Sequence, residues 1–152
     1  MKRAPSAVPV PGGNHANYLN RELSWLAFNS RVLEEANNPV NPLLEQLRFL
    51  AISYRNLEEF YSVRVAGLKA QHHAGVEKTS LDGLTPFRQL QAIHLETQKI
   101  FTEQQKTWAR LRGLMGEQAI VILEPGILSA EEKANLKARF LSEVFPLLTP
   151  LA

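Results

Sequence analysis

Few side chains in this chain have both the type and the spacing that active-site chemistry requires. His72-His73 are neighbours in the sequence, so on a helix they point in different directions and cannot bind one metal ion as histidines four residues apart can. Glu34-Glu35 and Glu58-Glu59 lack the facing geometry and the contrasting environments that a general acid and a general base need. We therefore expect no catalytic residue and no metal ligand. The histidine pair and Glu34-Glu35 are expected to face solvent, and Glu58-Glu59 to favour the positive end of a helix.

The other histidines and the basic residues form no recognisable site. His15 is expected in a loose tail, and His94, which has no carboxylate at metal-ligand spacing, in a packing or surface role. Neither glycine-rich phosphate loop, GxxxxGK(S/T) or GxGxxG, occurs. Six basic residues are dispersed over the first half of the chain: Arg21, Arg31, Arg48, Arg55, Arg64 and Lys69. They are expected to be solvated surface charges, with convergence on an anion in the fold as the alternative.

For Asn56, a structural role and a functional role compete closely. It precedes Leu57-Glu58-Glu59 at the start of an expected helix, where its side chain would act as an N-cap worth ~0.5–2 kcal/mol against alanine. The start of a helix also concentrates unpaired amides and positive potential, which suits a nucleotide. The two roles are not exclusive, so Asn56 is the candidate binding residue of this chain.

The elements that must position Asn56 are helical. Apolar residues at spacings of three and four predict four helices, over residues 20–36, 41–52, 56–75 and 85–112. Tyr54-Arg55 interrupts the pattern between the second and third helices, and Gly113 and Gly116 are expected to end the fourth. Short connections favour packing between neighbours, so these helices are expected to form an antiparallel bundle.

The pattern changes near residue 119. Ala119–Leu123 is a short β-branched run followed by Pro125-Gly126, which predicts a buried strand and a turn. Ser129 and Glu132 form a capping box that predicts a helix to about Val144. One strand is not stable without partners, so the sequence is expected to end inside a second, mixed α/β domain.

Composition narrows the class of protein. The 152 residues carry a net charge of +2, which does not indicate nucleic-acid or membrane affinity. The absence of cysteine excludes disulfides and thiolate sites. No stretch approaches the ~20 apolar residues of a membrane span, and no signal peptide is evident, so a cytoplasmic location is expected.

Three segments, residues 20–36, 41–52 and 56–68, resemble in their order and spacing the opening of a type 1 polyphosphate kinase. The similarity is dense from Tyr18 to Gln71, returns at 80–86 and is weak at 144–151. This family transfers the terminal phosphate of ATP reversibly to polyphosphate through a phosphohistidine, with magnesium. The resemblance implies a helical N-terminal domain, a head domain, and two C-terminal domains that hold the catalytic histidine, arginines and metal ligands.

The resemblance also gives Asn56 a role. In the family, the asparagine of an N-L-(D/E)-E-F segment contacts ATP, and here Asn56 begins that segment. The sequence departs from the family in two ways: Tyr54-Arg55 replace small polar residues, and Glu58 replaces the commoner aspartate. No position matches the phosphohistidine motif.

The resulting prediction is a mainly α chain with three parts. Residues 1–17 form a flexible tail, 18–116 the helical N-terminal domain, and 117–152 the truncated beginning of the head domain. The resemblance implies ATP or ADP as substrate, magnesium bound by residues outside this chain, polyphosphate bound by the missing domains, and a homodimer of the full-length enzyme. The chain alone is expected to be inactive. The alternative is a stand-alone, non-catalytic helical interaction or regulatory module.

Overall fold

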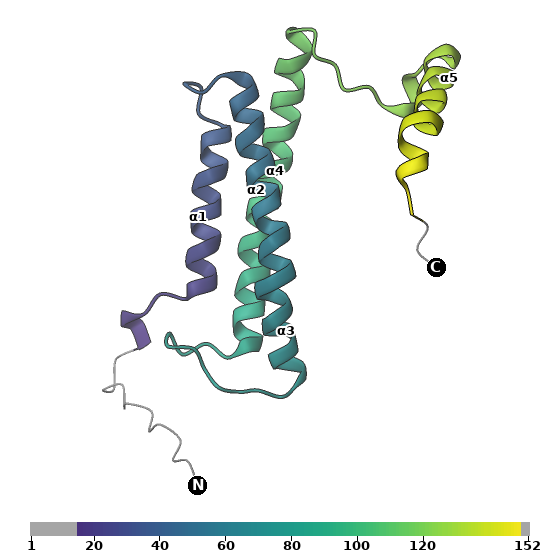
Figure 1. The fold of residues 1–152 in the computed structure, drawn as a ribbon. Helices are drawn as coiled ribbons and strands as arrows, with labels where there is room; N and C mark the ends of the chain where they lie inside the picture. The colour runs from purple at the N-terminus through teal and green to yellow at the C-terminus, as the bar shows by residue number, and fades with distance from the viewer. Residues whose placement is uncertain (1–14, 150–152) are drawn as a thin grey trace. The chain divides into compact units, whose positions relative to one another are not determined.

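The computed structural model describes residues 15–149, and all regular structure within them is helical. The α-helices are α1 (Arg21–Ala36), α2 (Leu43–Phe60), α3 (Ala66–His73), α4 (Pro86–Glu117) and α5 (Ala130–Arg139) (Figure 1). The chain divides into two compact units between Leu114 and Met115. None of the described helices is long and apolar enough to cross a membrane.

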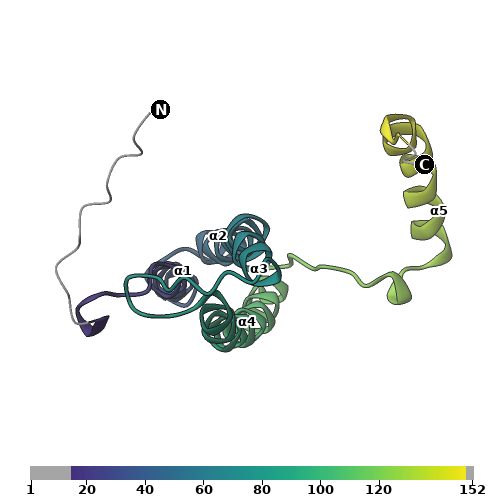
Figure 2. The same cartoon turned by 90° about the horizontal axis from the view of Figure 1, so that it is seen from below.

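The first unit is a bundle in which α1, the α2–α3 segment and α4 lie side by side. Figure 2, which looks along the helix axes, shows α1, α2 and α4 at the corners of a triangle. Asn20, just before α1, donates to Gln89 near the start of α4 at 3.2 Å. Asn37, just after α1, donates to Thr107 towards the end of α4 at 2.9 Å. The helical bundle is therefore confirmed, with α1 and α4 parallel to each other and antiparallel to α2.

One apolar cluster fills this bundle, as the helical spacing predicts. Its buried members are Leu26, Leu33, Ala36, Leu50, Leu57, Phe60, Val65, Leu68, Ile93, Ile100 and Leu111. Trp25 extends the cluster by stacking on Phe60, with ring centroids 4.7 Å apart. Phe28 and Phe101, which the same spacing places on apolar faces, are instead about half exposed, because the triangular arrangement covers only part of each helix.

The predicted break at Tyr54-Arg55 is wrong. The helix α2 runs through both residues to Phe60, so the expected second and third helices are one segment. Neither residue is glycine or proline, and both have ordinary helix propensities. Tyr54 also packs against the core and accepts a 2.6 Å hydrogen bond from Gln105 of α4, which favours an unbroken helix.

A π-helical turn over Tyr61–Val65 joins α2 to α3. Buried residues in this region are Phe60, Val65 and Leu68, whereas Val63, expected on the apolar face, is 62% exposed. A π-turn holds one residue more than an α-turn, so the core-facing position moves from four residues after Phe60 to five. This extra residue explains why the strict α-helical spacing selects Val63 and misses Val65.

The ends of the helices follow the sequence signals unevenly. Gly75 has a φ of 69° and closes α3, as expected for a left-handed cap. The prediction that Gly113 and Gly116 end α4 is wrong, since α4 continues to Glu117. The left-handed position there belongs to Ala119, with a φ of 59°.

At the start of α2, Asn41-Pro42 marks the boundary but Asn41 is not the cap. Pro42 occupies the N-cap position, directly before the first helical residue, Leu43, and no side-chain hydrogen bond caps the helix there. The side chain of Asn41 donates instead to the backbone carbonyl of Glu35 at 2.9 Å. Arg110 of α4 donates to the last carbonyl of α1, Ala36, at 2.7 Å, which satisfies one of the acceptors that a helix end leaves unpaired.

The second unit contains no strand among its described residues, so the strand predicted over Ala119–Leu123 is wrong. A strand needs a neighbour for its backbone hydrogen bonds, and the described part of the chain offers none. The capping box is confirmed: Ser129 accepts from the Glu132 amide at 3.2 Å, and the Ser129 amide donates to the Glu132 carboxylate at 2.7 Å. Hydrogen bonding to Ser129, first through its backbone amide and then through its side chain, holds the pKa of the Glu132 carboxylate below its usual value.

Candidate functional site

Asn56 lies in the last third of α2, on the side that packs against α1, and its side chain is half-buried. Because Asn56 lies inside α2, the predicted N-cap role is wrong. The positive electrostatic potential of a helix start is therefore not available to a nucleotide at this residue. The side chain instead donates from Nδ2 to Oδ1 of Asn29 in α1, at 3.0 Å. Asn56 is therefore held by an interhelical hydrogen bond.

The Asn56–Asn29 pair belongs to a polar network that crosses the centre of the bundle. Asn29 is completely buried and donates from Nδ2 to the backbone carbonyl of Ser53 at 3.2 Å. Gln104 of α4, also completely buried, donates to the hydroxyl of Ser53 at 2.9 Å. The network thus joins all three sides of the bundle at the level of Asn56.

Three residues of this network, Asn29, Ser53 and Gln104, were not predicted from the sequence. Each lies in register with an apolar stripe: Asn29 follows Leu26 by three residues, and Gln104 follows Ile100 by four. A polar residue in such a register is buried and needs hydrogen-bond partners. Their spacing from apolar residues could have predicted that these three side chains are buried, but it could not have predicted their hydrogen-bond partners.

Next to the asparagine pair along the two helices is a pair of stacked aromatic rings. Trp25 precedes Asn29 by one helical turn and Phe60 follows Asn56 by one turn, and these two rings stack with an interplanar angle of 10°. Trp25 is only partly buried. The half-exposed amide of Asn56 therefore lies one helical turn from a buried ring, Phe60, whose stacking partner Trp25 is partly exposed. A partly exposed aromatic ring near an amide suits a planar ligand.

The other candidate residues stay apart. His72-His73 are exposed, as predicted, with ring centroids 6.0 Å from each other. His94 is exposed and lies beside Gln98. His15 was expected in a loose tail, but its Nδ1 lies 2.9 Å from the carbonyl oxygen of Leu81. Residues 1–14 of that expected tail lie outside the described residues.

The paired carboxylates also form no acid–base site. Glu34-Glu35 are exposed, as predicted. Glu58-Glu59 are exposed near the carboxyl end of α2, so the prediction that they favour the positive end of a helix is wrong. The six basic residues listed from the sequence are all exposed, and Arg48 pairs with Glu45 at 3.6 Å.

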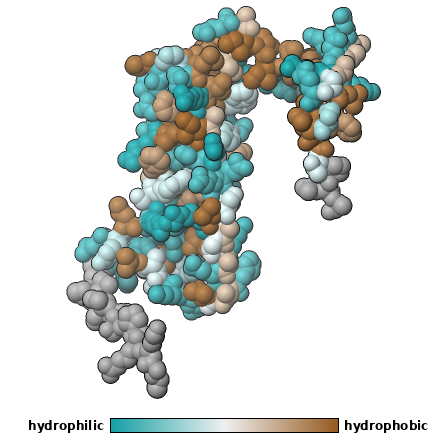
Figure 3. Space-filling model, in the orientation of Figure 1, coloured by the Kyte–Doolittle hydropathy of each residue, from teal (hydrophilic) through white to brown (hydrophobic). Residues whose placement is uncertain are grey.

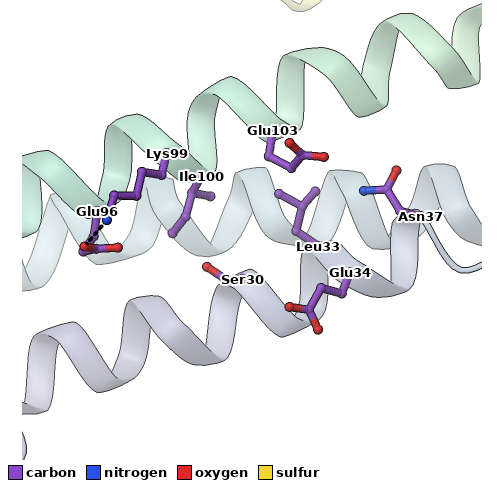
Figure 4. Close-up of a pocket in the computed structure, with 8 residues that line it drawn as sticks. All are labelled: Ser30, Leu33, Glu34, Asn37, Glu96, Lys99, Ile100 and Glu103. Carbon is purple, nitrogen blue, oxygen red and sulfur yellow. Dashed lines mark hydrogen bonds and ion pairs between the residues drawn. The ribbon is translucent and has the colours of Figure 1, made fainter.

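A groove of ≈ 470 Å³ lies between the parallel helices α1 and α4 (Figure 4). Its charged lining consists of Glu34, Glu96, Glu103 and Lys99, and Lys99 is already paired with Glu96 at 2.6 Å. This excess of carboxylates disfavours a phosphate group. Within residues 15–149, no three histidine or carboxylate side chains come together as metal ligands would.

A second polar cluster anchors the loop that precedes α4. Asp82 accepts from Asn20 at 2.9 Å and from Ser80, and Asn20 also caps α1 with 3.0 Å bonds from the Glu22 and Leu23 amides. Burial alone would raise the pKa of Asp82. The hydrogen bonds from Ser80, Asn20 and the backbone outweigh burial, so the pKa lies below the usual 3.8.

The family model described as "Polyphosphate kinase N-terminal domain" matches residues 18–123. A polyphosphate kinase of Thermosynechococcus vestitus is 45% identical over 152 residues, which cover 99% of this chain and 20% of that protein. One from Mycolicibacterium gilvum is 48% identical over 136 residues, covering 89% of this chain and 19% of that protein.

A polyphosphate kinase of Synechocystis is 44% identical over 153 residues, covering 100% of this chain and 21% of that protein. No solved structure matches the chain. The chain spans about a fifth of the length of the curated relatives it matches. With a match to the family model over most of its residues, the chain belongs to the polyphosphate kinase family, in the region of the family's N-terminal domain.

Proposed function

We propose that this chain is the N-terminal part of an enzyme that reversibly transfers the terminal phosphate of ATP to polyphosphate, and that it contacts ATP through Asn56. Family membership supports the reaction. The observation that carries the role of Asn56 is its half-exposed amide, held by a buried partner beside an aromatic stack. Such an amide is positioned before any ligand arrives, which lowers the entropic cost of binding.

The chemistry assigned to Asn56 is orientation of the nucleotide. Its side chain is uncharged and offers hydrogen bonds to a base or a ribose, but it cannot neutralise the charge that develops during phosphoryl transfer. In this proposal the phosphohistidine, the arginines and the magnesium ligands belong to other domains of the enzyme, which also bind polyphosphate and form a homodimer.

We assign residues 117–152 to the beginning of the head domain. No residue from 116 to 149 is buried, and Figure 3 shows apolar atoms at the surface of this part of the chain. Its large exposed apolar side chains are Ile120, Val121, Ile122, Leu123, Ile127, Leu136, Phe140, Leu141, Val144, Phe145, Leu147 and Leu148. So many uncovered apolar side chains support a segment that is completed by further sequence.

The proposal is tested by Asn56→Ala in the full product of the reading frame that encodes this chain. We expect the KM for ATP to rise about 3- to 10-fold, the equivalent of one hydrogen bond, with kcat within about two-fold. Asn38→Ala is the control, because Asn38 is also a partly buried asparagine with a side-chain bond, to Glu35 at 3.1 Å. An unchanged KM in Asn56→Ala with a lowered melting temperature would make Asn56 a purely structural residue.

For the 152-residue chain by itself, we expect no synthesis of polyphosphate from ATP and magnesium, because phosphoryl transfer depends on charged groups that position and stabilise the phosphates. The measurement is incorporation of labelled phosphate into acid-insoluble polymer, with the full reading-frame product as positive control. Magnesium-dependent synthesis by the pure chain would contradict the proposal. A reading frame that encodes no further domain would favour a non-catalytic interaction module instead.

A further inference from the structure

We infer that Asn29 is a positioning residue that fixes which end of the Asn56 amide faces the nucleotide, and that Asn56 thereby selects a base carrying an exocyclic amino group. This inference rests on the proposed contact between Asn56 and ATP. The inference adds Asn29 to the site and states that Asn56 accepts, rather than donates, the hydrogen bond to the nucleotide. Both statements follow from the polar network around Ser53.

The direction of the network is set by a backbone carbonyl. One polar atom of the Asn29 side-chain amide lies 3.2 Å from the backbone carbonyl oxygen of Ser53. A carbonyl oxygen can accept a hydrogen bond but cannot donate one. The Asn29 atom at that position must therefore be Nδ2. This places Oδ1 of Asn29 on the opposite side, towards Asn56 at 3.0 Å. Because Asn29 is completely buried, it has no solvent alternative that would favour the flipped amide.

The same logic then fixes Asn56. An oxygen of Asn29 needs a donor, so the Asn56 atom that faces it is Nδ2. The remaining polar atom of Asn56, Oδ1, has no donor among the residues that the structure describes. Gln104 Oε1 is the one fully buried, unpaired side-chain oxygen or nitrogen of the described residues, so Oδ1 of Asn56 is not closed off from solvent. Asn56 is thus preset to accept a hydrogen bond from a ligand rather than to donate one.

The third side of the network keeps Ser53 in place. Gln104 of α4 donates to the Ser53 hydroxyl at 2.9 Å, and its own Oε1 is buried without a partner in the described residues. This contact joins α4 to α2 at the level of the asparagine pair. It acts on the Ser53 side chain, whereas the direction of the Asn29 amide depends on the Ser53 backbone. The two contributions can therefore be separated by mutation.

An acceptor at Asn56 distinguishes bases by their donors. The 6-amino group of adenine can donate to Oδ1, whereas a purine without that group leaves Oδ1 unpaired in a partly desolvated position. A site built to hydrogen-bond an N–H group discriminates against the analogue that lacks it. We expect the wild-type protein to prefer ATP over purine-riboside triphosphate, which lacks only the 6-amino group, by about 3- to 10-fold in kcat/KM.

The test compares this ratio in variants of the full reading-frame product. Asn29→Leu removes the acceptor for Asn56 Nδ2, so the Asn56 amide can rotate and the ratio should fall to within about two-fold of unity. Asn29→Asp keeps an oxygen towards Asn56 in either protonation state, and should retain the ratio. Ser53→Ala is the matched control: it removes the hydroxyl bonded by Gln104 but keeps the carbonyl, so it should lower the melting temperature and leave the ratio unchanged.

The experiments separate three claims: the selectivity for the 6-amino group, the positioning role of Asn29, and the contact between Asn56 and ATP. A ratio near unity in the wild type, with Asn56→Ala still raising the KM for both nucleotides, would overturn the inference and leave the proposed function intact. A ratio retained in Asn29→Leu, or lost equally in Ser53→Ala, would remove the positioning role of Asn29. A KM for ATP that does not respond to Asn56→Ala would refute the proposed contact between Asn56 and ATP, on which the inference rests.

Discussion

At the scale of single residues, Asp82 shows how one carboxylate joins the loop before α4 to the start of α1, which is 62 residues away in the sequence. Its oxygens accept from Asn20 at the start of α1 and from Ser80 in its own loop. Asn20 in turn donates to Gln89 in α4. Gly83, whose φ is 84°, permits the tight turn that brings Asp82 to this position. The ionised carboxylate therefore helps to hold the loop and both helices together.

The lowered pKa of Asp82 predicts a pH dependence of stability. The folded-state pKa lies below the usual 3.8, so the ionised form stabilises the fold fully at pH values above 3.8, and this contribution is lost as the pH falls through the folded pKa. We expect Asp82→Asn to destabilise the protein more at pH 7 than at about pH 3. Urea unfolding of wild type and variant at both pH values measures this.

Glu77→Gln is the control for that experiment, because Glu77 is an exposed carboxylate in the same loop. We expect it to leave the free energy of unfolding within about 0.5 kcal/mol of wild type at either pH. An equal effect of Asp82→Asn at pH 7 and at pH 3 would show that the charge of Asp82 is not what stabilises the loop.

At the scale of elements, the π-turn between α2 and α3 decides which residues of this segment are buried. The core-facing residues Phe60 and Val65 are five apart, whereas an α-helix would place them on different faces. Removing one residue inside the turn would restore α-helical spacing, because Val65 and Leu68 would then follow Phe60 by four and seven positions.

Deletion of Ser62, an exposed residue in the π-turn, is therefore expected to be tolerated. We expect its free energy of unfolding to change by less than about 1 kcal/mol, since the core-facing side chains stay on one face. Deletion of Arg55, an exposed residue in regular α-helix, is the matched control. It turns one part of the helix by ~100° and is expected to cost at least ~3 kcal/mol. A similar loss of stability in both deletions would contradict this account of the turn.

At the scale of the whole molecule, the first unit has its own core. All buried members of the apolar cluster lie between Leu26 and Leu111. The family model matches residues 18–123, and α4 ends at Glu117. A protein of residues 15–123 therefore keeps the complete bundle.

We expect the chain 15–123 to unfold cooperatively, with a melting temperature within about 4 °C of the 152-residue chain, which corresponds to less than ~1 kcal/mol. Far-UV circular dichroism and differential scanning calorimetry measure this. A non-cooperative transition, or a melting temperature lower by more than ~8 °C, would show that residues outside 15–123 contribute to the stability of the bundle.

Local signals in the sequence were sufficient for the existence of the helices, for several of their ends, and for the family. Asn20, Thr85-Pro86, Gly75 and the Ser129 capping box mark helix ends, because capping depends on residues within one turn of each other. The N-L-(D/E)-E-F segment that identifies Asn56 is likewise contiguous. What local signals could not supply was the continuity of α2 through Tyr54-Arg55, since contact with α4 supports it.

By itself, the sequence determined that the first part of this chain is a helical bundle of the polyphosphate kinase family and that Asn56 is its candidate binding residue. Only the tertiary structure decided how Asn56 is held, because packing between α1 and α2 brings Asn29 to Asn56 and to the carbonyl of Ser53. The strand predicted over 119–123 failed for the same physical reason. A strand, like a buried amide, is defined by partners that lie far away in the sequence.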